Sequence, residues 1–301
     1  MLDSIMKYLD MEGHKKLYFT KSGCDMINCA QEMITRERIV IRDEKNIVIP
    51  GCQLYLTNSE TINAFTTKID DAHCIFINKG VLEEQKTYLE GLKWDFLDIV
   101  KREKYIEGMI EYGFYFLVFH EYAHIYCGHV DAGLTDFSDK KAQECEADMF
   151  AIDYLVSFIL NFKSEEVVNE LEKMYLAVFF LFQKMQKQNY LEIYNDKLIQ
   201  NYYDEERADK RDHPLDAQRI LYLYEMLNIV VVTENVQLLP IKENILEKIM
   251  ILKGVSDSEL PRRENDYFIA NESIQKLKKT VADIRKKIPR ISESMLSDNQ
   301  S

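Results

Sequence analysis

The stretch FHEYAHIYCGH, residues 119–129, gathers three histidines and a glutamate in a chain that has six histidines among 301 residues. Within it, HEYAH (120–124) fits the pattern H-E-x-x-H. On a helix, residues four apart lie on one face, so His120 and His124 can direct imidazole nitrogens at one metal ion. Glu121 can reach a water bound to that ion and take its proton. The stretch therefore predicts a helix with a zinc site, and the alternative is an ordinary polar helix.

A third ligand is available in KAQECEADMFA (141–151), on the next predicted helix. Glu144 and Asp148 lie four apart there, and the small or apolar Ala151 and Leu155 continue their stripe. Because a solvated face would not keep such residues, we expect the stripe to pack against the first helix. Glu144 then completes the site, and Asp148 hydrogen-bonds a ligand imidazole. The alternative is a charged helix start, where acidic residues favour the helix dipole.

Two nearby residues have competing interpretations. Glu146 is another possible ligand, but it lies about 200° around the helix from Glu144 and is expected to face away. His129 follows His124 by five residues, past Gly128, and either supports a metal ligand or is purely structural.

The segment DHPLDAQRI (212–220) is a second catalytic candidate. Pro214 suits the first position of a helix, which puts His213 at the cap and Arg219 inside the helix. An imidazole and a guanidinium near a polarised carbonyl can stabilise an oxyanion. The alternative is an ordinary helix start.

The composition indicates a helix-rich globular protein. Apolar residues make up 47% and charged residues 30%, with only 10 glycines and 5 prolines. The net charge of −13 argues against a nucleic-acid partner. The basic segment 276–290 carries apolar residues at helical spacing, so we expect an amphipathic helix docked on the body, the alternative being a basic contact surface.

Three features predict a cytoplasmic protein with no membrane partner. The six cysteines include no CxxC pair, which favours reduced thiols. The amino terminus has no apolar h-region. The longest apolar run, 174–182, is too short to span a bilayer.

The predicted fold class is α+β, mostly helical, with a small N-terminal sheet packed on the helix of the HEYAH motif. Residues 1–105 are expected to form a mixed α/β part and residues 106–301 a helical body, packed as one unit. The expected helices are 1–17, 22–36, 81–103, a motif helix from about 106 that ends at Gly128, 140–162 with Ser138 and Asp139 as cap candidates, 164–200, 214–228, 241–253 and 270–288. The expected strands are RIVIR (38–42), NIVIP (46–50), CQLYL (52–56) and HCIFIN (73–78), with a turn at Asp43–Asn46.

HEYAH followed by ECEAD (144–148) resembles the gluzincin metallopeptidases, which are zincin-like. The extended form HEYAHIYCGH…ECEADMFA…HPLDAQRI is most similar to the soluble phage-exclusion peptidases of the Lit type, over about residues 115–225. The resemblance implies a Zn²⁺-dependent endopeptidase with three metal ligands (His120, His124 and Glu144), a general base (Glu121) and two groups that assist the transition state (His213 and Arg219).

The resemblance also bears on the substrate. Lit-type proteins are similar to bacterial defence enzymes that cleave a translation elongation factor, whereas the ImmA/IrrE-like peptidases share both motifs and cut repressors. The implied partner is therefore a protein substrate, a translation factor or a regulator. A latent protease that an activator partner switches on shares the same chemistry. HCIFIN (73–78) is expected to offer an edge on which an extended substrate pairs its backbone.

A zinc-stabilised sensor or partner-binding protein without catalysis is the competing hypothesis. Its closed site would need a fourth protein ligand, for which Cys127 and His129 are available. Glu121 argues against this hypothesis, because a carboxylate beside the first ligand has a catalytic use and no structural one.

Overall fold

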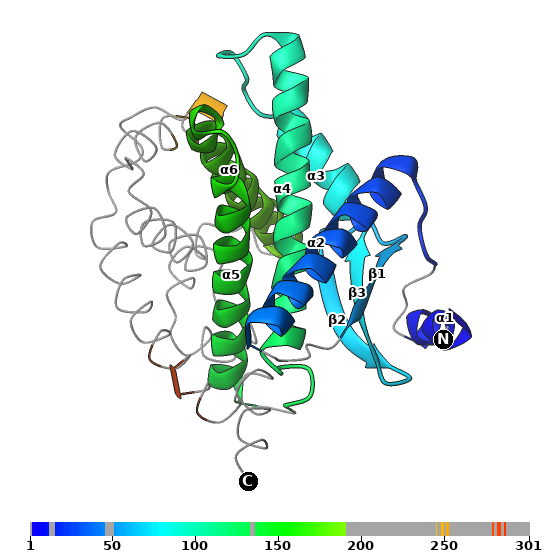
Figure 1. Cartoon of the computed structure of the whole chain (residues 1–301). Helices are drawn as coiled ribbons and strands as arrows, with labels where there is room; N and C mark the ends of the chain where they lie inside the picture. Colours follow the sequence, from blue (N-terminus) through cyan, green and yellow to red (C-terminus); the bar gives the residue numbers. More distant parts are fainter. Residues whose placement is uncertain are drawn as a thin grey trace.

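The fold is α+β, as the sequence predicts. The structure, a computed structural model, describes residues 2–11, 16–45, 51–132 and 136–190 and a few positions between 245 and 286. Its elements are α1 (Leu2–Met11), α2 (Lys21–Lys45), β1 (Cys52–Thr57), β2 (Ala64–Ile69), β3 (Ala72–Asn78), α3 (Gly80–Glu90), α4 (Ile99–Tyr126), α5 (Phe137–Leu160) and α6 (Ser164–Tyr190). Figure 1 shows α4 at the centre, with the sheet on one side and α5 on the other.

The three strands form one sheet in the order β1-β3-β2, with β1 parallel and β2 antiparallel to β3. Successive β3 side chains alternate between two cores, as strand geometry requires. Cys74 and Phe76 pack with α1, whereas Ile75 and Ile77 join the main core formed with the other helices. β3 is therefore buried on both faces.

The strands CQLYL and HCIFIN are confirmed as β1 and β3. The expectation that HCIFIN offers a free edge is wrong, because β3 is paired on both sides. A further strand that the sequence did not predict, β2, is joined to β3 by a tight turn at Asp70 and Asp71. Both aspartates have positive φ, 48° and 63°, as in the two-residue hairpin turns that match strand twist.

The expected strand RIVIR (38–42) and the turn after it are wrong, because α2 continues through Lys45. A helix that has already formed gains one hydrogen bond for each further residue. A β-branched residue in a helix costs only a few tenths of a kcal/mol relative to alanine, about 0.7 at most. The three β-branched residues of RIVIR therefore do not end α2. NIVIP (46–50) lies outside the described residues.

The single helix expected over 81–103 is also wrong, because the chain breaks between α3 and α4. The Trp94 ring is buried, and its Nε1 donates to the Leu89 carbonyl 2.8 Å away, near the end of α3. Asp98 then caps α4, with its Oδ1 accepting from the Lys101 backbone N–H at 2.9 Å. Such a cap is favourable at a helix start.

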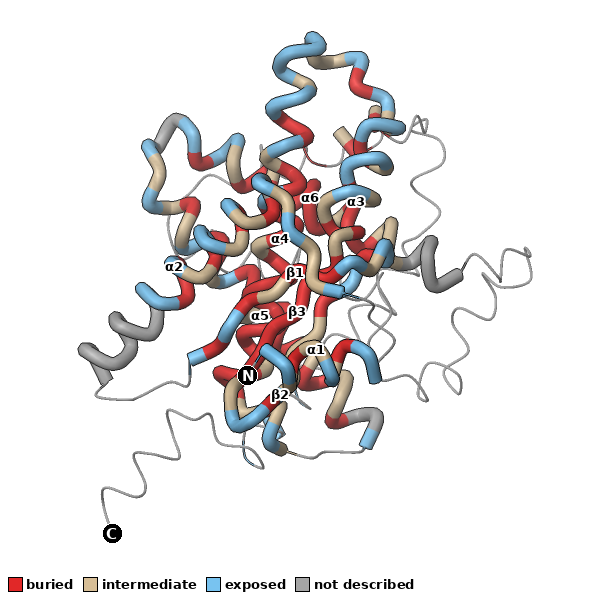
Figure 2. Tube along the Cα trace, turned by 90° about the vertical axis from the view of Figure 1, so that its right-hand side faces the viewer, coloured by how far each residue is buried: buried red, intermediate tan, exposed pale blue. Residues whose placement is uncertain are grey.

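Helix α4 is the central element of the described structure. It contacts α2, α3, α5, α6, β2 and β3. Its second half is buried on nearly every side, as expected of a helix that is apolar all round. Figure 2 shows buried residues concentrated along α4, α6 and the strands. The helix is followed by Gly128 with φ 75°, which confirms the predicted C′ glycine.

Helix α5 lies along α4, as its apolar stripe predicts. Ala147, Ala151 and Leu155 are fully buried, and small residues allow close approach of two helices. The predicted caps are wrong: Ser138 and Asp139 lie inside α5, and the Asp136 carboxylate accepts from the Asp139 backbone N–H at 3.3 Å. An aspartate just before the first turn serves the cap equally well.

The C-terminal predictions fall mostly outside the described residues. The 164–200 helix is seen as α6 up to Tyr190, and the 214–228 helix lies in the undescribed part. The described positions of the expected 241–253 and 270–288 helices are helical. Lys279, Asp283 and Lys286 are exposed, as expected of the charged face of an amphipathic helix. Within the described residues, no helix is both long and apolar enough to cross a bilayer.

Candidate metal centre

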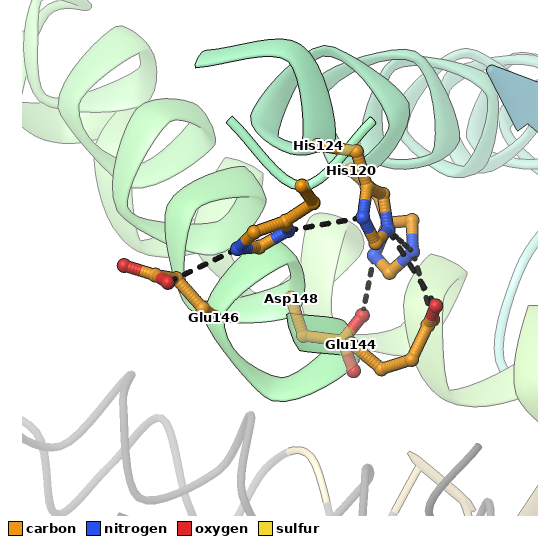
Figure 3. A network of polar contacts seen from close by, with 6 residues as sticks. His120, His124, Glu144, Glu146 and Asp148 are labelled. Carbon is orange, nitrogen blue, oxygen red and sulfur yellow. Dashed lines mark hydrogen bonds and ion pairs between the residues drawn. The ribbon is translucent and has the colours of Figure 1, made fainter. Parts of the chain in front are cut away.

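Three side chains from α4 and α5 converge near the end of α4 (Figure 3). The Nε2 atoms of His120 and His124 are 3.3 Å apart. Glu144 places Oε2 3.2 Å from His120 Nε2 and Oε1 3.6 Å from His124 Nε2. The spacing of four on α4 aligns the two imidazoles, and the packing of α5 on α4 brings the carboxylate to them.

The donor atoms fit Zn²⁺ in both chemistry and separation. Two imidazole nitrogens and a carboxylate oxygen are ligands that zinc prefers. Tetrahedral bonds of about 2.0–2.1 Å place neighbouring ligand atoms about 3.3 Å apart. The observed separations of 3.2, 3.3 and 3.6 Å bracket that value. The three residues could therefore hold a zinc ion with little rearrangement.

Asp148 supports the first imidazole from the opposite side of its ring. Its Oδ1 is 2.8 Å from His120 Nδ1, and the carboxylate is fully buried. Burial lowers the pKa of His120, but Asp148 and Glu144 outweigh burial and raise this pKa to about 10. The two carboxylates therefore favour a cation at this position, whether a proton or a metal ion.

The second imidazole is supported differently. His124 Nδ1 lies 3.1 Å from His129 Nδ1, and His129 Nε2 lies 3.2 Å from Glu146 Oε2. Burial lowers the pKa of His124 to about 3, although Glu144 opposes this effect. Glu146 points away from Glu144, as its helical angle predicts, but it is buried against His129 and not solvated.

Cys127, His129 and Glu146 form a second group of possible metal ligands. All three are buried, and their donor atoms lie within 4.8 Å of one another. From the sequence, Cys127 and His129 were expected as a possible fourth ligand to the first site, and His129 also as a support for a metal ligand. Glu146 was considered only as an alternative to Glu144, and its contact with His129 could not be predicted, because the direction of the chain after Gly128 cannot be read from the sequence.

Access to the three-residue site differs between its members. The His124 and Glu144 side chains remain 13% and 14% exposed, whereas Asp148 is sealed from solvent. Glu121, the expected base, follows His120 on α4 and is 8% exposed. His213 and Arg219, the expected transition-state helpers, lie outside the described residues.

A comparison with known families gives an independent indication of function. Residues 100–234 match the family model Peptidase U49. The matched segment spans less than half of the 301 residues but includes all of α4 except its first residue, α5, α6 and every site residue named above. No curated protein and no solved structure matches the chain significantly. The family match supports a peptidase function for this segment.

Proposed function

We propose that this protein is a zinc-dependent endopeptidase that cleaves a protein substrate. One observation carries the proposal: two imidazole nitrogens and a carboxylate stand at tetrahedral ligand separations. The segment that supplies them is similar to a peptidase family. His120, His124 and Glu144 are the proposed metal ligands.

Glu121 is the proposed general base. When bound, Zn²⁺ would supply Lewis-acid chemistry by polarising the scissile carbonyl and making water more acidic. Glu121 adjoins His120 on α4 and is largely buried, so it lies on the helix that supplies two of the proposed ligands. It would accept the proton of the attacking water and pass it to the leaving amine. His213 and Arg219 are proposed to stabilise the oxyanion.

The outer side of β2 is the proposed binding edge for an extended substrate. β2 is an edge strand of the sheet, and no other strand of the described residues pairs with its outer side. It contacts α4, and Lys68 Nζ on β2 lies 3.4 Å from Asp131, just beyond the end of α4. Backbone pairing at this edge would hold a peptide near the metal ligands.

We also propose a cytoplasmic role in phage defence. The substrate would be a translation factor or a regulator, and an activator partner would switch the enzyme on. The motif similarity to Lit-type peptidases supports the role, and the six cysteines present as thiols fit a reducing compartment.

A closed, non-catalytic zinc site is less well supported. His129 contacts His124 on its Nδ1 side, whereas the three proposed ligand atoms meet on the Nε2 side. His129 is thus poorly placed to become a fourth ligand to that ion.

The test is substitution of the proposed base. Glu121→Gln should keep bound zinc but lower cleavage at least about 100-fold, because general-base catalysis contributes that much or more. Chelator-sensitive fragments in a host lysate provide the assay. Glu107→Gln, an exposed glutamate on the same helix, is the matched control and should cut normally. A Glu121→Gln protein that cuts at full rate would show that the assigned base is wrong.

A further inference from the structure

The contacts of His129 form a continuous path from the proposed metal ligand His124 to the buried carboxylate of Glu146. The two gaps along this path are 3.1 Å and 3.2 Å. Both distances are in hydrogen-bond range. His129 and Glu146 are 7% and 2% exposed, so water does not compete strongly for these contacts. His129 thus uses both ring nitrogens within the protein.

The proton positions along this path follow from one requirement. A neutral imidazole carries one N–H, and the nitrogen that binds a metal must be unprotonated. If His124 binds the ion through Nε2, its proton is on Nδ1 and points at His129 Nδ1. His129 Nδ1 must then accept, so the His129 proton is on Nε2. That N–H donates to the Glu146 carboxylate.

We propose that Glu146 is a positioning residue that acts through His129 to hold His124 in the tautomer that presents Nε2 to the metal. This inference rests on the proposed zinc site. Asp148 performs the same task for His120 by direct contact. Partners that fix the tautomer of a ligand histidine commonly change metal affinity or activity 10–100-fold.

The same proton order argues against a second metal ion at Cys127, His129 and Glu146. An ion bound to His129 Nε2 would require the His129 proton on Nδ1. That proton would face the Nδ1 proton of His124 at a nitrogen separation of 3.1 Å. Two donors cannot share this contact, so the first site and the second group cannot both hold an ion through Nε2.

Tautomers in the wild-type protein provide the first test. With six histidines in the chain, ¹⁵N-histidine spectra of the zinc-loaded protein are simple enough to assign. We expect a proton on Nδ1 of His124 and on Nε2 of His129. A proton on Nδ1 of His129 would overturn the proposal. This measurement does not depend on any variant folding correctly.

Zinc affinity, measured by competition with a chromophoric chelator, provides the second test. Glu146→Ala should weaken zinc binding about 10–100-fold, and Glu146→Gln, which keeps an acceptor oxygen, should recover part of the loss. Cys127→Ala is the matched control and should bind one zinc with unchanged affinity.

Three outcomes of the affinity test separate the possibilities. Unchanged zinc affinity in Glu146→Ala would overturn the positioning role and leave the zinc site standing. Two zinc ions per wild-type chain, one of them lost in Cys127→Ala, would replace the proposal with a second metal site. A wild-type protein that binds no zinc would overturn the proposed function together with this inference.

Discussion

The two imidazoles of the candidate metal centre are supported in different ways. His120 touches a carboxylate directly, at 2.8 Å from Asp148. His124 reaches a carboxylate only through the ring of His129. Both carboxylates belong to α5, but the second support also needs the turn at Gly128, which carries His129 back towards α4. The His120 side therefore depends on helix packing, whereas the His124 side depends on a turn as well.

The largest effect on zinc affinity should come from Glu144, whose carboxylate lies beside both imidazoles. Glu144→Ala removes one of three ligands, so zinc affinity should fall more than about 100-fold, beyond the loss that supporting residues cause. Chelator competition measures the affinity. Asp153→Ala, an exposed carboxylate on the same helix, is the control and should bind zinc normally. Normal zinc binding by Glu144→Ala would remove Glu144 from the ligand set.

An intermediate effect should distinguish the two supports from each other. Asp148→Asn keeps an acceptor oxygen near His120 but removes a buried negative charge in direct contact with the ring. Zinc affinity should fall about 10–100-fold. The loss should exceed that of Glu146→Gln, because the Glu146 charge acts from one ring further away. Equal losses in the two variants would contradict the difference between the two sides.

The smallest effect should come from the turn. Gly128 has φ 75°, where a side chain costs about 1–2 kcal/mol. Gly128→Ala should lower the free energy of unfolding by about that amount in denaturant titrations. Gly91→Ala is the matched control: Gly91 has φ −77°, and an added Cβ there meets only ordinary contacts at 3.5 Å or more.

Gly91→Ala should be neutral or slightly stabilising, by up to about 1 kcal/mol. In zinc-loaded Gly128→Ala, the ¹⁵N signals of His129 and His124 should shift more than that of His120. A shift at His120 as large as or larger than the shifts at His129 and His124 would show that the turn supports both ligand imidazoles.

Helical periodicity explains what the sequence alone could predict. The spacing of His120 and His124 and the stripe from Glu144 to Leu155 are local patterns, and each fixes a helix face. The structure places both faces together. The α+β class and the strands β1 and β3 were likewise predictable, because their apolar runs are short and bounded by turns.

Long-range contacts explain what the sequence could not predict. The break between α3 and α4 lies at tertiary contacts, because the Trp94 ring is buried in the core and the Lys93 backbone N–H donates to the Leu252 carbonyl at 3.0 Å. β2 was missed because its alternation is weak and its Asp70–Asp71 turn lacks the glycine that usually marks such hairpins. The contact between Glu146 and His129 depends on how α4, the turn at Gly128 and α5 pack together, which the local sequence does not specify.

Anomalous scattering at the zinc edge from crystals of the zinc-loaded protein tests the central claim most directly. The expected result is one peak per chain, about 2.0–2.2 Å from His120 Nε2, His124 Nε2 and a carboxylate oxygen of Glu144. No peak between these three residues, or a peak at Cys127, His129 and Glu146 instead, would contradict it.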